Sequence, residues 1–117
     1  MGQIKTVRIY GASQEQGIRI LADRLWPRGI SREQAHIDLW WRDIAPSPEL
    51  RKWYGHDGDR FPEFAARYTD ELSKSAFAHR CREQVRELLK EGDVLLLFAA
   101  KDTRNNNAVV LKQWLEQ

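Results

Sequence analysis

Apolar residues recur along this chain with two different periods, and the order of these stretches predicts an α/β fold. Residues 4–10, IKTVRIY, alternate in the manner of a half-buried strand, and GIRILADRLW predicts a second, more apolar strand near 18–25. The run DVLLLFAA at 93–100 is apolar without interruption, which is typical of a strand buried on both faces. The pattern therefore predicts a sheet that helices cover.

Four further stretches carry the helical period of 3.6 residues. Ser47-Pro48-Glu49 provides an N-cap hydroxyl, a proline at the first helical position and an acidic first turn. Further along the chain, apolar side chains recur at i, i+3 and i+4 spacing. These signals predict helices at 48–54, 60–73, 77–90 and 106–116.

The segment SREQAHIDLWWRDIA, residues 31–45, fits both periods. Ser31 with Gln34 matches a capping box, and the apolar residues that follow fit helical spacing. Ile37, Leu39 and Trp41 also alternate as they would in a strand. We predict an irregular or helical segment here.

Length and composition place these elements in one domain. A chain of 117 residues with 42% hydrophobic and 31% charged side chains is long enough for one core and too short for two. The expected fold is a single α/β domain over 1–117, with a small sheet of three or slightly more strands covered by helices. No apolar run approaches the ~20 residues needed to cross a bilayer, and the start of the chain lacks a signal-peptide pattern, so a cytoplasmic location is expected.

Charge, cysteine and histidine content exclude several classes of function. A net charge of +2 is too small to draw the whole molecule to nucleic acid, so any basic surface must be local. The single cysteine, Cys81, cannot form an internal disulfide, and the three histidines lack the spacing of a metal site. The sequence indicates neither a metal nor an organic cofactor.

The stretch DRLWPRG, which ends the second predicted strand, carries the densest local charge. Arg24 or Arg28 is suited to bind a carboxylate or phosphate through two hydrogen bonds. Trp26 supplies a flat apolar wall, and Asp23 can orient an arginine or act as a base. A structural interpretation fits equally well, in which Asp23 pairs with an arginine, Trp26 fills the edge of the core and the Pro-Arg-Gly end forms a turn.

The stretch KDTRNNN follows the third predicted strand and leads into the last helix, an arrangement that builds ligand sites in open α/β sheets. The free amides of the first helical turn and the charge of Lys101 favour an anion, and Asp102 is a candidate acid or base. Asn105, Asn106 and Asn107 offer amide groups to a ligand. The simpler interpretation is that one asparagine caps the helix and the others lie in a solvated loop.

A third cluster, LRKWYGHD, provides the secondary candidates Arg51, Lys52, His56 and Asp57. Imidazole titrates near neutrality, so His56 beside Asp57 suggests a general base. Neighbours in sequence rarely bring their side chains together, however. The simpler interpretation is that Asp57 or Asp59 caps the next helix.

With these three motifs, the chain resembles the YeaO-like proteins, short members of domain of unknown function family 488. The resemblance covers nearly the whole chain and implies a bacterial cytoplasmic α/β domain in which the two charged loops line one cleft; it implies no substrate.

The link from Gly11 to Gly17 is short for a parallel crossover and by itself favours a hairpin. Longer relatives suggest a strand-helix-strand unit there, so the resemblance implies a mainly parallel sheet. Some relatives have histidine where this chain has Asn107, so a mechanism that needs that imidazole is not expected.

Two classes of function agree with these patterns. The first is a domain that binds a small anion bearing phosphate or carboxylate, either as a binding protein or as an enzyme with Asp23 or Asp102 as acid or base. The second is a nucleic-acid-binding module that uses the basic stretch Arg19–Arg32. A protein-interaction role for the tryptophan-rich region 40–53 is a third hypothesis. Because the carboxyl ends of parallel strands share one edge, we expect DRLWPRG and KDTRNNN to face a common crevice.

Overall fold

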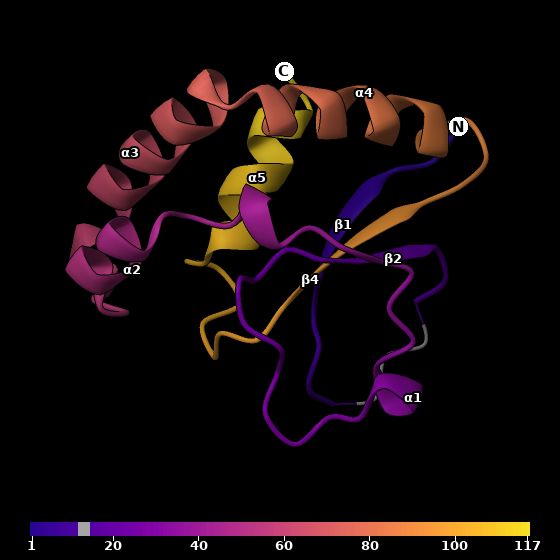
Figure 1. The fold of residues 1–117 in the computed structure, drawn as a ribbon, viewed down its shortest axis with the longest axis horizontal. Coiled ribbons are helices and arrows are strands. Elements are labelled where there is room, and N and C mark those ends of the chain that lie inside the picture. Colours follow the sequence, from indigo (N-terminus) through magenta and orange to yellow (C-terminus); the bar gives the residue numbers. More distant parts are fainter. Residues whose placement is uncertain (12–14) are drawn as a thin grey trace.

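The sheet has four strands, all parallel, in a computed structural model that describes residues 1–11 and 15–117. The strands are β1 (Ile4–Arg8), β2 (Ile18–Leu21), β3 (Leu39–Trp40) and β4 (Val94–Phe98), and their order across the sheet is β1-β4-β2-β3. The mainly parallel α/β fold is therefore confirmed, with one strand more than the three that the sequence located. The strand β4 lies between β1 and β2 (Figure 1) and pairs with both in parallel, so the first two strands do not form the hairpin that a short link favours. The link itself, residues 11–17, lies partly outside the described residues.

The long helices lie within one residue of their predicted bounds. They are α2 (Pro48–Tyr54), α3 (Phe61–Lys74), α4 (Ala76–Leu89) and α5 (Asn107–Leu115). Within the described part of the chain, no helix combines the length and the apolar character that a membrane span requires. The capping signals explain the accuracy, because serine or asparagine side chains bond the first-turn amides of α2, α4 and α5.

Two predictions about the strands need correction. The second strand ends at Leu21 rather than near residue 25, because the side chain of Asp23 accepts the bond from the Ala99 N–H that would otherwise continue the ladder. The segment 31–45 contains the predicted capped turn α1 (Arg32–Ala35) and a 3₁₀ turn (Arg42–Ile44), but also the unpredicted strand β3. A strand of two residues is too short to show a period.

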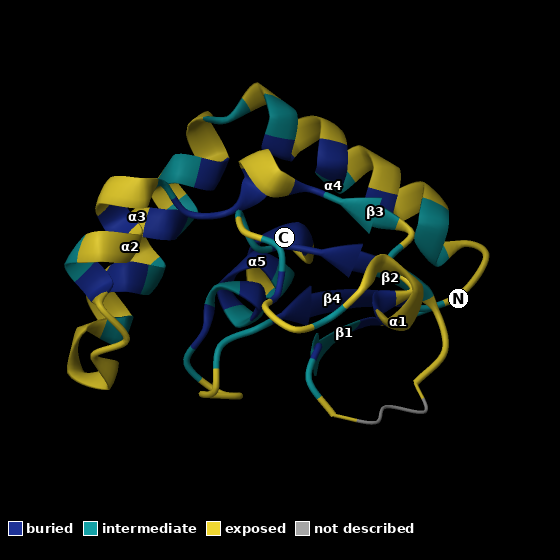
Figure 2. Ribbon diagram, turned by 60° about the horizontal axis from the view of Figure 1, so that its bottom comes forward, coloured by how far each residue is buried: buried dark blue, intermediate teal, exposed yellow. Residues whose placement is uncertain are grey.

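The two faces of the sheet are covered in different ways. Alternate residues of β4, including Leu96, pack with α3, α4 and α5 in the larger core, whereas Leu95 and Leu97 face a smaller core beneath α1 and the loops around it. Figure 1 shows α4 and α5 on one side of the sheet and α1 on the other. All five residues of β4 are buried (Figure 2), as predicted for a central strand.

The helix α2 is attached to α3 through a single carboxylate. Glu71 on α3 accepts hydrogen bonds from the backbone N–H of Ser47 at 2.9 Å and from its hydroxyl at 2.6 Å. The hydroxyl in turn accepts the bond from the Leu50 N–H that caps α2. Glu71 thus holds the capping residue that fixes the start of α2.

We expect Glu71→Ala to lower the free energy of unfolding by about 1–3 kcal/mol, because a part-buried N–H and a hydroxyl lose their acceptor. Urea denaturation measures the change. Glu83→Ala is the matched control; this glutamate is exposed and pairs only with Arg86 on the same helix, so its loss should cost less than about 0.5 kcal/mol. An equal loss of unfolding free energy in the two variants would show that the hydrogen bonds between Glu71 and Ser47 stabilise the fold no more than a surface carboxylate does.

Candidate functional site

A cleft of about 560 Å³ opens beyond the carboxyl ends of the strands. Its lining comes from four segments, around 23–28, 45–48, 51–56 and 99–107, together with Tyr10 and Phe64. The loops that follow β2 and β4 leave the same end of the sheet (Figure 1). The expectation that DRLWPRG and KDTRNNN share an edge is therefore confirmed.

Asp23 joins the three elements that meet at the floor of the cleft. Its Oδ2 accepts a hydrogen bond from the backbone N–H of Ala99 at 2.8 Å, and its Oδ1 accepts one from Asn107 Nδ2 at 3.1 Å. The same amide nitrogen donates to the carbonyl of Ala22 at 3.2 Å. Both carboxylate oxygens are thus used to connect the ends of β2 and β4 with the start of α5.

The protonation of Asp23 follows from its position. Burial raises the pKa of its carboxyl group above the ordinary value, and the hydrogen bonds from Asn107 and Ala99 and the positive charge of Arg51 only partly offset this effect. Asp23 is thus a part-buried carboxyl group whose two oxygens both accept hydrogen bonds.

Arg24 supports the wall of the cleft through backbone bonds. Its Nη2 donates to the carbonyls of Ala45 at 3.3 Å and Pro46 at 3.4 Å, and Nη1 lies 3.8 Å from the exposed carboxylate of Asp43. Its Nε is buried and has no hydrogen-bond partner within the described residues. Both terminal nitrogens of the Arg24 guanidinium therefore contact residues of the 43–46 loop.

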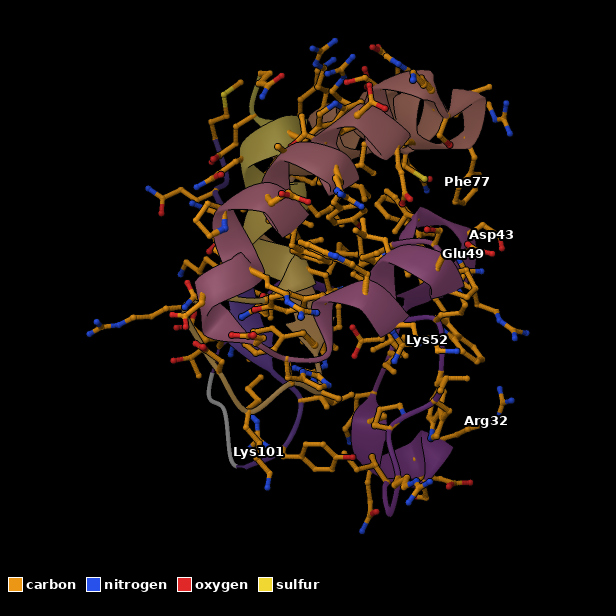
Figure 3. All side chains as sticks on the ribbon, turned by 90° about the vertical axis from the view of Figure 1, so that its left-hand side faces the viewer. Arg32, Asp43, Glu49, Lys52, Phe77 and Lys101 are labelled. Carbon is orange, nitrogen blue, oxygen red and sulfur yellow. The ribbon has the colours of Figure 1, made fainter. Side chains whose placement is uncertain are left out.

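Three other cationic side chains line the cleft without bonds of this kind to the described residues. Arg28, Arg51 and Lys52 are exposed, and they make no side-chain hydrogen bond or ion pair with the part of the chain that the structure describes. Figure 3 shows Lys52 on α2 and Lys101 at the bottom of the view, on a separate part of the molecule. The cleft therefore holds free positive charge on two walls.

The arginine-rich stretch is largely used by the fold. Arg19 donates to the carbonyls of Ala35 and His36, and Arg32 stacks on Trp26 with 5.3 Å between its guanidinium carbon and the ring centroid. Of the four arginines in this stretch, Arg28 is the one that reaches the cleft without a partner among the described residues. Fewer arginines of this stretch are thus available to a ligand than the sequence indicates.

Trp26 forms part of the cleft wall and is held firmly. Its indole N–H donates to the carbonyl of Ile30 at 2.7 Å, and its ring meets Trp40 edge-on at 5.4 Å between centroids. Beside it, the hydroxyl of Tyr10 donates to the carbonyl of Arg28 at 2.9 Å and ties this loop to the end of β1. The wall that carries Arg28 is therefore rigidly attached to the sheet.

The asparagine loop divides into structural and cleft-facing parts. Asn106 is buried and caps α5, with its Oδ1 accepting from Val109 N–H at 3.0 Å, and it lines the cleft together with Asn105 and Asn107. Asp102 accepts bonds from the backbone N–H groups of Arg104 and Asn105, which lowers the pKa of its carboxyl group. Lys101 and Asp102 do not belong to the lining of the cleft.

The candidate residues of LRKWYGHD also divide into residues that line the cleft and one that lies outside it. Arg51, Lys52 and His56 line the cleft. Asp57 lies outside the lining and caps the short 3₁₀ turn Gly58–Arg60, accepting from Asp59 N–H at 3.0 Å, which is the simpler of its two predicted roles. The described residues contain no group of three or more histidine, cysteine, aspartate or glutamate side chains that could hold a metal.

The lining residues that sequence reasoning missed include Tyr10, Leu25 and Tyr54. Tyr10 follows β1 at its carboxyl end, so the strand-end argument that selected Asp23 would also have selected it. Leu25 is exposed in spite of its apolar side chain, and no sequence pattern distinguishes it from a core leucine.

The chain matches known proteins over its whole length. A family model described as "Inactive DUF488-N3 subclade" matches residues 3–117. The uncharacterised protein Rv3073c of Mycobacterium tuberculosis is 37% identical over 114 residues, 97% of this chain and 93% of that protein. The uncharacterised protein YeaO of Escherichia coli is also 37% identical, over 96% of each chain. No solved structure gives a significant match. The chain is thus a YeaO-like member of the DUF488 family, in its inactive N3 subclade.

Proposed function

We propose that this domain binds a small anionic molecule, bearing phosphate or carboxylate, in the cleft at the carboxyl ends of the strands. The observation that carries the proposal is the set of free cations, Arg28, Arg51 and Lys52, which line one cleft on two walls. Against them stands one lining carboxylate, Asp23, whose two oxygens already accept hydrogen bonds. Positive charge gathered around one cleft in this way attracts an anion and offers it charge-assisted hydrogen bonds.

We propose further that binding is not followed by catalysis. Of the two candidate acids, Asp23 is engaged by two donors, and Asp102 faces its own loop outside the cleft. A general base needs a free oxygen within reach of a substrate. The word "inactive" in the description of the matching family supports the same choice.

The nucleic-acid and protein-interaction alternatives receive less support. Base stacking needs free aromatic faces, but Arg32 lies over Trp26, Arg42 over Trp40, and both Arg60 and Arg67 over Trp53. Trp41 is buried in the core. The tryptophans of this chain are therefore used mainly in packing.

Thermal unfolding with added phosphate tests the proposal. A ligand that binds the folded state at a hundred times its dissociation constant stabilises that state by about 2.7 kcal/mol. We expect phosphate to stabilise the wild type more at low than at high sodium chloride, and Arg28→Gln combined with Arg51→Gln to lose at least about tenfold in phosphate affinity, because each charge-assisted hydrogen bond contributes about 1.5–3 kcal/mol.

Phosphate also stabilises proteins in general through its exclusion from their surfaces, so a matched variant is required. Arg80→Gln removes an exposed arginine from α4, outside the cleft, and should leave the phosphate response unchanged. If the wild type, the double variant and the control respond equally to phosphate and to carboxylates such as citrate, the cleft does not bind anions.

A further inference from the structure

The cleft has an apolar part as well as a charged one. Beside Arg28 the lining contains Leu25, Trp26 and Pro27, and the opposite side contains Tyr54 stacked on Phe64 with 4.4 Å between ring centroids. An inorganic anion would contact the cations but leave the exposed side chain of Leu25 and the partly exposed ring of Trp26 in water. The lining therefore fits a molecule that joins an anionic group to a carbon body.

Leu25 is the sharpest indication of such a body. Its exposed fraction is 63%, and among the described residues only the terminal Met1 is another large hydrophobic side chain with high exposure. A leucine held in water at the mouth of a cleft gains free energy when a ligand covers it. Because DRLWPRG is fixed by the bonds of Trp26 and Tyr10, Leu25 is presented on a rigid loop.

The number of positive charges in the cleft favours a phosphate over a single carboxylate. Three free cations exceed what one carboxylate neutralises, whereas a phosphate monoester carries about −1.5 to −2 at neutral pH and offers three acceptor oxygens. Trp26 and Tyr54 both belong to the lining and favour a flat ring as the carbon body, because aromatic rings also meet edge to face, as Trp26 and Trp40 do. A volume of about 560 Å³ lies within the range of clefts that enclose drug-sized ligands, ~300–1,000 Å³.

We infer that the ligand is a phosphate monoester attached to a flat heteroaromatic body, as in a mononucleotide or the 5′-phosphate end of a nucleic acid strand. This inference rests on the proposed function and adds the class of ligand. The phosphate lies between Arg28, Arg51 and Lys52, and the ring lies against Leu25 and the aromatic wall.

Isothermal titration calorimetry with five probes tests the inference: inorganic phosphate, adenosine 5′-monophosphate, adenosine, and a short single strand in two forms, with and without a 5′-phosphate. We expect the monophosphate to bind at least about tenfold more tightly than either phosphate or adenosine, because only it uses both parts of the cleft. A phosphorylated strand that binds more tightly than the free nucleotide would identify a strand end as the source, and the reverse order would identify the free nucleotide; both orders support the inference.

Equal affinity for phosphate and the monophosphate would overturn the inference and leave the proposed function standing. Binding of adenosine as tight as that of the monophosphate would also overturn the inference, and no binding of phosphate, the monophosphate or citrate would overturn both. Leu25→Ser provides a second test. It should weaken monophosphate binding about three- to tenfold and leave phosphate binding unchanged, while Leu25→Met, which keeps the apolar surface, should restore the wild-type value. Unchanged monophosphate binding in Leu25→Ser would show that the ring does not lie there.

Discussion

Asp23→Ala is expected to destabilise the domain by about 2–4 kcal/mol, because it leaves two part-buried donors without an acceptor. The Ala99 N–H lies at the end of the central strand and loses its acceptor. The amide of Asn107 keeps its bond to the carbonyl of Ala22 but loses its link to the loop after β2. Urea denaturation of the two proteins measures the difference in the free energy of unfolding.

Asp23→Asn separates the hydrogen bonds from the charge. One amide oxygen can still accept, but the new NH₂ group faces a donor, so we expect an intermediate cost of about 1–2 kcal/mol. Removal of the negative charge from the cleft should at the same time strengthen phosphate binding. Lower stability with higher phosphate affinity is the combination that the proposed function requires. Weaker phosphate binding in this variant would contradict the assignment of Asp23 to a structural role beside an anion site.

The pKa of Asp23 fixes the direction in which the stability of the wild type, relative to Asp23→Asn, changes with pH. Burial holds the pKa of Asp23 above its unfolded value, so between the two values the folded state binds more protons than the unfolded state. The contribution of Asp23 to stability is therefore lost as pH rises through the folded pKa and fully present below the unfolded pKa, near 3.9. The stability of the wild type relative to Asp23→Asn should rise as pH falls through this window.

The helices could be predicted from the sequence because their signals are local. Ser47, Ser75 and Asn106 cap α2, α4 and α5 with their own side chains, and the apolar period fixes which face is buried. The central strand was equally clear, because a strand with neighbours on both sides and cover on both faces has no polar positions.

The end of β2 and the strand β3 depend on contacts that are distant in sequence. β2 stops where Asp23 takes the place of a backbone acceptor for Ala99, 76 residues away. β3 exists because Leu39 and Trp40 pair with Ile20 and Leu21, although their own pattern fits a helix equally well. Tertiary pairing decides such short elements, so no local period could have located them.

The position of the candidate site was predictable, but the division of labour within it was not. The strand-end rule selected both charged loops, and they do meet. Which cations face the cleft depends on loop geometry: Lys101 points elsewhere, whereas Arg51 and Lys52 reach it from a helix some 25 residues after the second strand. The sequence also could not show that Arg19 and Arg24 would be used to bind backbone carbonyls.

Leu97→Ala is expected to cost about 3–5 kcal/mol, because Leu97 is fully buried on the central strand and its loss leaves a cavity. Leu97 belongs to the smaller core, with Leu21, Ala35 and Ile9, which α1 and loops cover instead of long helices. Trp26 and Tyr10, which wall the cleft, pack against the same cluster. The cavity should therefore loosen the loop that carries Arg28 and Leu25, and weaken ligand binding as well as stability.

Leu96→Ala is the matched control for this effect. It is the neighbouring leucine on the same strand and is equally buried, but it faces the larger core, to which the wall residues Trp26 and Tyr10 do not belong. We expect a similar loss of stability, about 3–5 kcal/mol in urea denaturation, with phosphate affinity close to wild type. Leu97→Ala should in addition lose several-fold in phosphate affinity, measured by calorimetry at a temperature where both variants are folded. If both variants lose affinity equally, the small core does not control the cleft wall, and if neither does, the wall is held by the hydrogen bonds of Trp26 and Tyr10 alone.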